Sequence, residues 1–223
     1  MNALLRHPHR SFGHVRLVLA VILAAGAAAA VFWSREAPSR QFVREATAKR
    51  VVNGHYVKLK DDEKLIYLGM RAPYENEPMF RESRDRNEQL VVDQTLRLRY
   101  DREAPMRDRK DRLWAYAFLN DGTFVNATLL REGLAYARLH PHVRRFRREL
   151  LEAQTEARAA RRGLWAHVTP TDETAYPADT KHAAFHRPGC EDATDIDAER
   201  RVEFSNKDEA FTNGFCPCNK CRP

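Results

Sequence analysis

The chain has 223 residues and a net charge of +7, with 38 lysines and arginines against 31 aspartates and glutamates. Hydrophobic residues make up 43% of it, which is enough for a packed core and excludes wholesale disorder. The 9 glycines and 11 prolines are too few for collagen-like or low-complexity proteins, and the single long apolar segment excludes a polytopic membrane protein.

That apolar segment lies near the N-terminus, at residues 17–33, and follows three arginines without any acidic residue. A basic flank before an apolar run is typical of a segment that enters a membrane with its basic end in the cytoplasm. Trp33 marks the expected membrane exit, so we predict an uncleaved transmembrane helix at about 15–33. Residues 1–40 then hold a cytoplasmic stub, this helix and a stalk, and the bulk of the chain is periplasmic, outside the cell inner membrane. A signal peptide cleaved within the alanines at 27–30 is the alternative.

Residues 41–166 alternate short apolar strands with helices. Asn53-Gly54 between apolar alternations predicts a β-hairpin. Apolar periodicity predicts further strands at 56–59, 65–68, 96–100 and 114–119, and helices at 78–91, 126–132 and 143–164. The last helix places its apolar residues on one face, and Gly163 is expected to form a left-handed C-cap. About five strands and three helices predict an α+β domain in which helices pack on a small β-barrel.

All four cysteines lie in the C-terminal part, after an expected linker at 167–181. His186 and Cys190 are four residues apart, and Cys218 and Cys221 form a Cys-x2-Cys pair, which is a spacing suited to tetrahedral zinc. We therefore predict one Zn²⁺ bound by these four residues in a module at 182–223. Two disulfides are the alternative in an oxidising compartment. In the zinc interpretation, Cys216 is a free thiol or an alternative ligand.

Four motifs occur in a fixed order in the second half of the barrel region, at 112–116, 121–126, 129–135 and 157–165. Together they resemble the thermonuclease (staphylococcal nuclease-like) family, over about residues 42–166. The resemblance implies an OB-fold barrel of five strands with three helices. It also implies, for active members, calcium-dependent hydrolysis of DNA and RNA by a metal-held water, a general base and two arginines on the phosphate.

The family's active-site positions are mostly substituted in this chain. Asn53-Gly54-His55-Tyr56 stands where the family has Asp-Gly-Asp-Thr, and Arg71-Ala72-Pro73-Tyr74 stands where it has Asp-x-Pro-Glu. His55 and Arg71 thus replace two carboxylates, Tyr74 replaces the base and Ile66 replaces one arginine, whereas the second arginine is retained as Arg112. Calcium prefers carboxylate oxygens, and a tyrosine with a pKa near 10 is a weak base. We therefore expect no Ca²⁺ at this site and no activated water.

The basic residues beside this site form a candidate surface for nucleic acid, since cation–phosphate contacts dominate such binding. They are Arg71, Arg107, Arg109, Lys110 and Arg112. OB barrels bind single strands across one face, which makes single-stranded nucleic acid the expected ligand. The alternative is a solvated basic surface whose charge is offset by neighbouring acidic residues.

The C-terminal motifs resemble a second family, the Ada-type metal-binding domain. The shared features are His-Arg-Pro-Gly-Cys at 186–190, a strand at 202–204, a helix from about 207 and Gly-Phe-x-Pro-Cys-x-x-Cys at 214–221. In that family four cysteines bind the metal, and one accepts a methyl group from a DNA phosphotriester. Here three cysteines match and His186 is the expected fourth ligand, so methyl transfer does not follow from the resemblance.

Three functions stay open from the sequence. The favoured one is a membrane-anchored, catalytically degenerate protein that binds nucleic acid or a partner in the cell envelope. The second is a metal-dependent nuclease with a relocated site that uses Glu75, Glu77 or the pair Asp61 and Asp62. The third is a structural envelope module in which the barrel and the zinc module both contact proteins.

Overall fold

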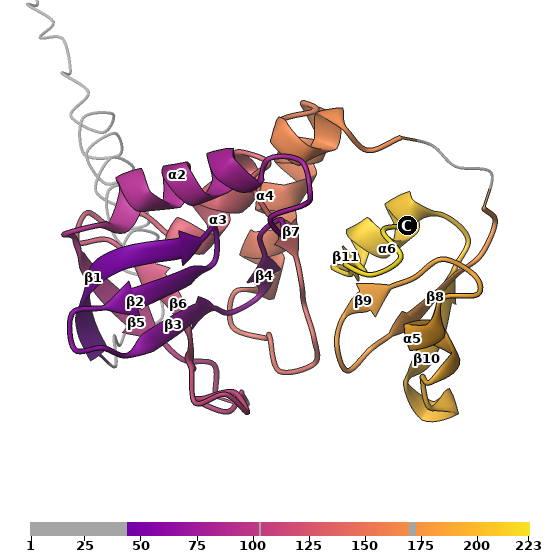
Figure 1. Cartoon of the computed structure of the whole chain (residues 1–223), viewed down its shortest axis with the longest axis horizontal. Helices are drawn as coiled ribbons and strands as arrows, with labels where there is room; N and C mark the ends of the chain where they lie inside the picture. The colour runs from indigo at the N-terminus through magenta and orange to yellow at the C-terminus, as the bar shows by residue number, and fades with distance from the viewer. Residues whose placement is uncertain (1–43, 103, 170–172) are drawn as a thin grey trace, which may run out of the picture. The chain divides into compact units, whose positions relative to one another are not determined.

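The computed structural model describes residues 44–102, 104–169 and 173–223. The chain divides into two units, 1–41 and 42–223, and the expected membrane anchor lies outside the described residues. Within the described ranges no helix combines the length and the apolar character that a membrane crossing needs. The second unit contains a barrel domain and a C-terminal sheet (Figure 1).

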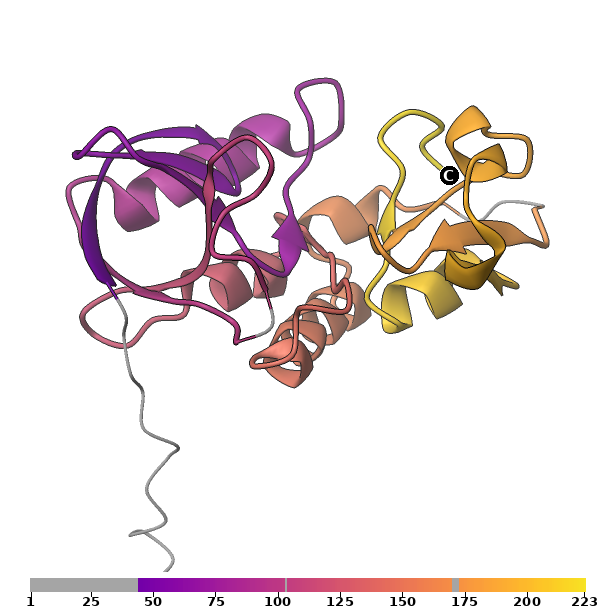
Figure 2. The ribbon, with the colours of Figure 1, turned by 90° about the horizontal axis from the view of Figure 1, so that it is seen from below.

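Five strands close the barrel in the order β1-β2-β3-β6-β5 (Figures 1 and 2). They are β1 (Arg44–Asn53), β2 (Tyr56–Leu59), β3 (Lys64–Tyr67), β5 (Thr95–Arg99) and β6 (Leu113–Phe118). All neighbours pair antiparallel except β3 and β6, which are parallel. The expected α+β class and the five-stranded barrel are confirmed, and the strand bounds differ from the predicted ones by about one residue, because alternation does not fix where a ladder ends.

Three helices accompany the barrel: α2 (Phe80–Val91), α3 (Val125–Arg131) and α4 (Arg147–Ala159). Helix α2 buries Ser83, Asn87 and Val91, which are spaced by four residues and lie on one face. The Asn87 side chain donates to the carbonyl oxygen of Asn53 and accepts from the hydroxyl of Tyr67. A Cβ on Gly54 would lie 1.8 Å from Ser83 Oγ, so the hairpin turn needs glycine to approach α2.

The final helix is shorter than its apolar stripe predicts. Val143 lies in the turn before α4, and Leu164 belongs to a separate 3₁₀ helix, Gly163–Ala166. Arg161 is the first left-handed residue after α4, with φ 49°, and Gly163 follows with φ 52°. The break allows the amide of Leu164 to donate to the carbonyl oxygen of Gly133, so a tertiary contact overrides the helical periodicity.

Two short strands lie outside the barrel and lead toward the C-terminal part. They are β4 (Met70–Arg71) and β7 (Tyr136–Ala137), which pair antiparallel with Arg71 opposite Tyr136. This strand pair places the Arg71 side chain next to β11 (Cys216–Pro217) in the C-terminal part, where it contacts Pro217.

The C-terminal sheet has the order β10-β8-β9-β11. Its strands are β8 (Tyr176–Asp179), β9 (Ala184–Phe185), β10 (Arg201–Phe204) and β11 (Cys216–Pro217), with helices α5 (Glu191–Thr194) and α6 (Lys207–Thr212) and a 3₁₀ helix, Ala198–Arg200. Strand β8 lies inside the segment 167–181 that was expected to be a linker. All four of its residues, Tyr176–Asp179, are buried. The polar residues on either side of this strand account for the prediction of a linker.

The buried apolar residues of the described ranges form three clusters: one of the barrel and its helices, a second that both parts of the chain share, and a small third around Cys190 and Cys218. In the second, Tyr136, Leu164 and Trp165 pack with side chains of the C-terminal part, such as Phe185 and Phe211. The ring centroids of Trp165 and Phe211 are 4.9 Å apart in an edge-on arrangement. The C-terminal part is therefore packed on the barrel domain through a common apolar core.

Candidate functional site

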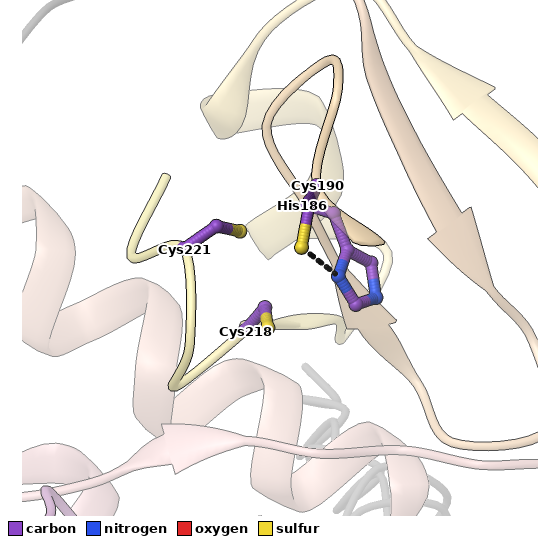
Figure 3. Close-up of side chains that lie close together, drawn as sticks. All are labelled: His186, Cys190, Cys218 and Cys221. Atoms are coloured by element: carbon purple, nitrogen blue, oxygen red, sulfur yellow. Dashed lines mark hydrogen bonds between the residues drawn. The ribbon is translucent and has the colours of Figure 1, made fainter. Parts of the chain in front are cut away.

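The four predicted metal ligands come together in the C-terminal part (Figure 3). The donor atoms of His186, Cys190, Cys218 and Cys221 all lie within 4.8 Å of one another. The sheet register explains the meeting, because β9 and β11 are parallel neighbours with Pro217 opposite Phe185. The next residues along the two strands are Cys218 and His186. A ligand pair 32 residues apart in the sequence is thus placed side by side by two short strands.

Two backbone amides are directed at the sulfur atoms of this cluster. The backbone amide of Lys220 lies 3.3 Å from Cys218 Sγ, and that of Arg187 lies 3.3 Å from Cys221 Sγ. Cys190 Sγ lies 3.5 Å from His186 Nδ1. His186, Cys190 and Cys218 are buried, and Cys221 is half-buried. Amide donors directed at sulfur stabilise a thiolate, which is the form that binds metal.

The donor set fits a zinc ion. Three sulfurs and one imidazole nitrogen match a structural zinc site, and bonds of about 2.0–2.3 Å place tetrahedral ligands roughly 3.5–4 Å apart. Burial raises the pKa of the Cys221 thiol to about 12, so a cation is needed to hold this sulfur as a thiolate. All four cysteines, each of them in the described ranges, are free thiols, so the structure does not contain the two disulfides of the alternative interpretation. The cluster could therefore bind a metal such as zinc.

The substituted nuclease position in β4 holds a buried ion pair. The Arg71 side chain is 3% exposed and that of Glu77 is 8% exposed, with 2.6 Å between Nη1 and Oε2. The same Glu77 oxygen accepts from the amide of Tyr74 at 2.8 Å. The guanidinium lies over the ring of Tyr136, with 4.9 Å from Cζ to the ring centroid. Burial opposes the charge, but the nearby Cys216 and Glu77 side chains outweigh it and raise the pKa of Arg71.

The second substituted carboxylate position, His55, is half-buried. Its Nδ1 accepts a hydrogen bond of 3.2 Å from the amide of Ala72. Burial lowers the pKa of His55 to about 3, and the positive charge of Arg71 adds to this effect. His55 is therefore a neutral imidazole at neutral pH, with its proton on Nε2.

The other positions that match the family's active-site residues are Ile66, Tyr74 and Arg112. Ile66 is buried and pairs with Tyr56 on one side and Trp114 on the other. Tyr74 is 38% exposed. Arg112 Nε donates to Asp108 Oδ2 at 2.7 Å, and its guanidinium lies 5.8 Å from the ring centroid of Tyr56.

These residues do not fit a calcium ion. Calcium takes six or more oxygen ligands, usually including carboxylates, whereas the carboxylate nearest Arg71 is Glu77, which this arginine already neutralises. Among the described residues, the only group of three or more His, Cys, Asp or Glu that could hold a metal ion is the cysteine cluster. Of the residues suggested for a relocated site, Asp61 pairs with Arg44 and Asp62 with Lys49.

The structure gathers most of the predicted nucleic-acid residues on one loop but removes Arg71 from it. Arg107 pairs with Glu63 through two hydrogen bonds of 2.7 and 2.8 Å, whereas Arg109 and Lys110 are exposed. Arg71 is buried against the C-terminal part, because its Nη2 donates to the carbonyl oxygen of Pro217 at 3.2 Å. The prediction of Arg71 as a surface contact for nucleic acid is therefore wrong.

The sequence alone did not reveal the roles of Glu77 and of the Pro217 carbonyl. The sequence suggests Glu77 only as part of a relocated metal-dependent site, and Pro217 is 146 residues from Arg71. No spacing rule connects positions so far apart. A usable signal was the substitution itself, because an arginine in the place of a buried carboxylate requires a new acidic partner.

Comparisons with known proteins agree with the barrel and its helices. The family described as "Staphylococcal nuclease homologue" matches residues 34–167. The thermonuclease of Staphylococcus intermedius is 31% identical over 126 residues, which cover 52% of this chain and 73% of that protein. The thermonuclease of Staphylococcus hyicus is 27% identical over 127 residues, covering 53% and 73%. The match exceeds half of the chain, and the chain belongs to the staphylococcal nuclease homologue family.

Proposed function

We propose that this protein is a thermonuclease-family domain that does not hydrolyse phosphodiesters and acts as a binding protein held at the outer side of the inner membrane. The buried Arg71–Glu77 pair supports the loss of activity most directly. It fills the position of a calcium-binding carboxylate with a cation that already has its own partner. A calcium ion there would meet like charge and a single, neutralised carboxylate.

The proton chemistry of hydrolysis is also missing at the matching positions. Tyr74 stands in the place of the general base, and the neutral His55 stands in the place of a second carboxylate ligand. General-base and electrostatic contributions of this kind each supply about 10²- to 10⁴-fold in rate. They do not simply add within one catalytic unit, but without the metal no nucleophile is formed.

The C-terminal cluster takes a structural zinc ion in this proposal, with His186, Cys190, Cys218 and Cys221 as its ligands. Four protein ligands leave no open position for a substrate, which is typical of structural zinc. Bound zinc would supply cross-linking between the two halves of the C-terminal part. The resemblance to Ada-type domains supports a metal role, and His186 in place of a cysteine supports a structural one.

The exposed loop at 107–112 is the proposed contact for single-stranded nucleic acid. Arg109 and Lys110 are exposed on it, and Arg112 is only partly covered by its pairing with Asp108. Because such contacts release counterions, binding should weaken as salt rises. A contact with an envelope protein is the other outcome that the binding test can give.

The test compares cleavage of DNA in a panel of metals with binding of single-stranded DNA at two salt concentrations. The Staphylococcus intermedius thermonuclease serves as the positive control for cleavage. We expect no calcium-dependent cleavage, together with salt-sensitive binding that Arg112→Ala reduces without abolishing. Strong cleavage in calcium that is lost in Arg112→Ala would overturn the proposal. Absence of binding at both salt concentrations would favour the protein contact.

Cell fractionation tests the proposed location. The full-length chain is expected in the inner-membrane fraction and accessible to protease from the periplasm. A soluble periplasmic protein that begins near residue 31 would refute the anchor and leave export intact.

A further inference from the structure

The metal cluster and the substituted nuclease position meet at one strand. Strand β11 consists of Cys216 and Pro217 only, and the ligand Cys218 follows it directly. On one side the strand pairs with β9. On the other side the Pro217 carbonyl oxygen accepts from Arg71 Nη2 at 3.2 Å. The amides of Cys216 and Cys218 donate to the carbonyl oxygens of Ala183 and Phe185, so the Arg71 contact is one of few hydrogen bonds that hold this short strand.

A second contact joins the same two regions at the end of the chain. Arg222, which follows the ligand Cys221, donates to the carbonyl oxygen of Asn76 at 3.3 Å. Asn76 is the neighbour of Glu77, the partner of Arg71. Strand β4 and the loop after it therefore contact the chain just before Cys218 and just after Cys221.

One pocket shows how close the two sites lie. A cavity of about 370 Å³ is lined by Arg71 and Tyr74 from the barrel domain and by the ligands His186 and Cys218. The free thiol Cys216 lines it as well. The former nuclease position thus forms part of the surroundings of the metal cluster.

We propose that Arg71, held in place by Glu77, is a positioning residue for the metal centre. It fixes the backbone before Cys218 and so arranges two of the four ligands before the metal binds. The inference rests on the proposed metal binding at this cluster. In this inference the substituted site has a structural role. The Arg71–Glu77 ion pair and the hydrogen bond to the Pro217 carbonyl make the metal affinity depend on the barrel domain.

The test measures zinc affinity of the detergent-solubilised full-length chain by competition with a chromophoric chelator. Arg71→Met alone would leave Glu77 buried and unpaired and could prevent folding, so the variant is the double change Arg71→Met and Glu77→Met. The control is Arg86→Met with Glu132→Met. That pair has two hydrogen bonds of 2.8 Å between α2 and the end of α3, outside the C-terminal part.

We expect the Arg71 variant to bind zinc about 10- to 100-fold more weakly, as is usual when support around metal ligands is lost. The control variant should keep the affinity of the unmodified chain. The visible spectrum of bound Co²⁺ should change only in the Arg71 variant, which a general loss of stability would not produce.

Unchanged affinity in a folded Arg71 variant would overturn the inference and leave the metal site intact. Equal weakening in both variants would overturn it too, because the effect would then be global. Absence of zinc binding by the unmodified chain would instead refute the metal site of the proposed function, and the inference with it.

Discussion

A single exchanged side chain, His55, gives the barrel a defined response to acid. Its folded pKa is lowered from 6.5 to about 3 by burial, so the unfolded chain binds a proton over this range that the folded chain does not. The stability that His55 contributes is therefore complete above pH 6.5 and is lost as the pH falls toward 3. The full slope for one group is about 1.4 kcal/mol per pH unit.

We expect the free energy of unfolding to fall by about 2 kcal/mol on this account between pH 7 and pH 5. His55→Gln should remove this part of the pH dependence, and the exposed His167→Gln should not. The buried His140, whose pKa is lowered to about 4, adds the same pH dependence of stability to every variant. Urea denaturation at the two pH values makes the comparison, and parallel curves for all three proteins would contradict the argument.

Cys216 differs from the other cysteines in its surroundings. It belongs to the apolar cluster shared with the barrel domain and not to the group of four potential ligands. Cys216→Ala should therefore retain one zinc per chain, whereas Cys218→Ala should lose the metal. Metal analysis of the two purified variants gives the answer. Loss of zinc from Cys216→Ala would show that this thiol is a ligand.

The site residues that the sequence could identify are those whose chemistry depends on short spacing. The four metal ligands follow from two local motifs, which a single sheet register then brings together. The environment of Arg71 could not be identified in this way. Its partners come from a loop, a strand and the C-terminal part, and only the folded chain places them around one guanidinium.

At the scale of single elements, α4 connects the two larger apolar clusters. It buries Leu150 and Ala153 against the barrel and Ala157 against the C-terminal part. The apolar stripe from Val143 to Leu164 predicts this face correctly, because burial follows the helical period. It cannot predict the ends of α4, since these depend on where the Gly133 backbone meets Leu164.

Gln154 on α4 links both parts through its amide. Its oxygen accepts from the amide of Ala137 at 2.7 Å, and its nitrogen donates to the carbonyl oxygen of Phe211 at 2.8 Å. Gln154→Ala leaves two buried backbone groups unpaired, which should lower the free energy of unfolding by about 2–4 kcal/mol. The exposed Thr155→Ala on the same helix should change it by about 0.5 kcal/mol or less. Urea denaturation that gives equal values for both would contradict the linking role.

At the scale of the whole molecule, the sequence identified the barrel but not its relation to the C-terminal part. A segment rich in Thr, Asp and Pro indicated a linker and hence two independent bodies. The structure instead has Tyr176 and Phe185 in one core with Trp165. Composition describes how polar a segment is, but it does not report which neighbouring surface that segment covers.

The shared core makes the end of the family match a poor place to shorten the chain. A protein that stops at residue 167 would expose Tyr136 and Trp165, which are 9% and 5% exposed in the full structure. We expect it to unfold at a lower temperature and to aggregate, because uncovered aromatic surface associates. Thermal unfolding and light scattering of both lengths test this. A shortened chain with unchanged stability would mean that the barrel domain folds on its own.

The buried Arg71–Glu77 pair also constrains which sequences this protein can reach by single substitutions. Changing either residue alone leaves a buried charge without its partner, at a cost of about 3–5 kcal/mol. Arg71→Asp would go further, since it would set two carboxylates side by side where one guanidinium now lies. Calcium binding at this position would therefore require several coordinated changes, and the intermediates would be unstable proteins. The ion pair is thus a barrier to single-step change at this position.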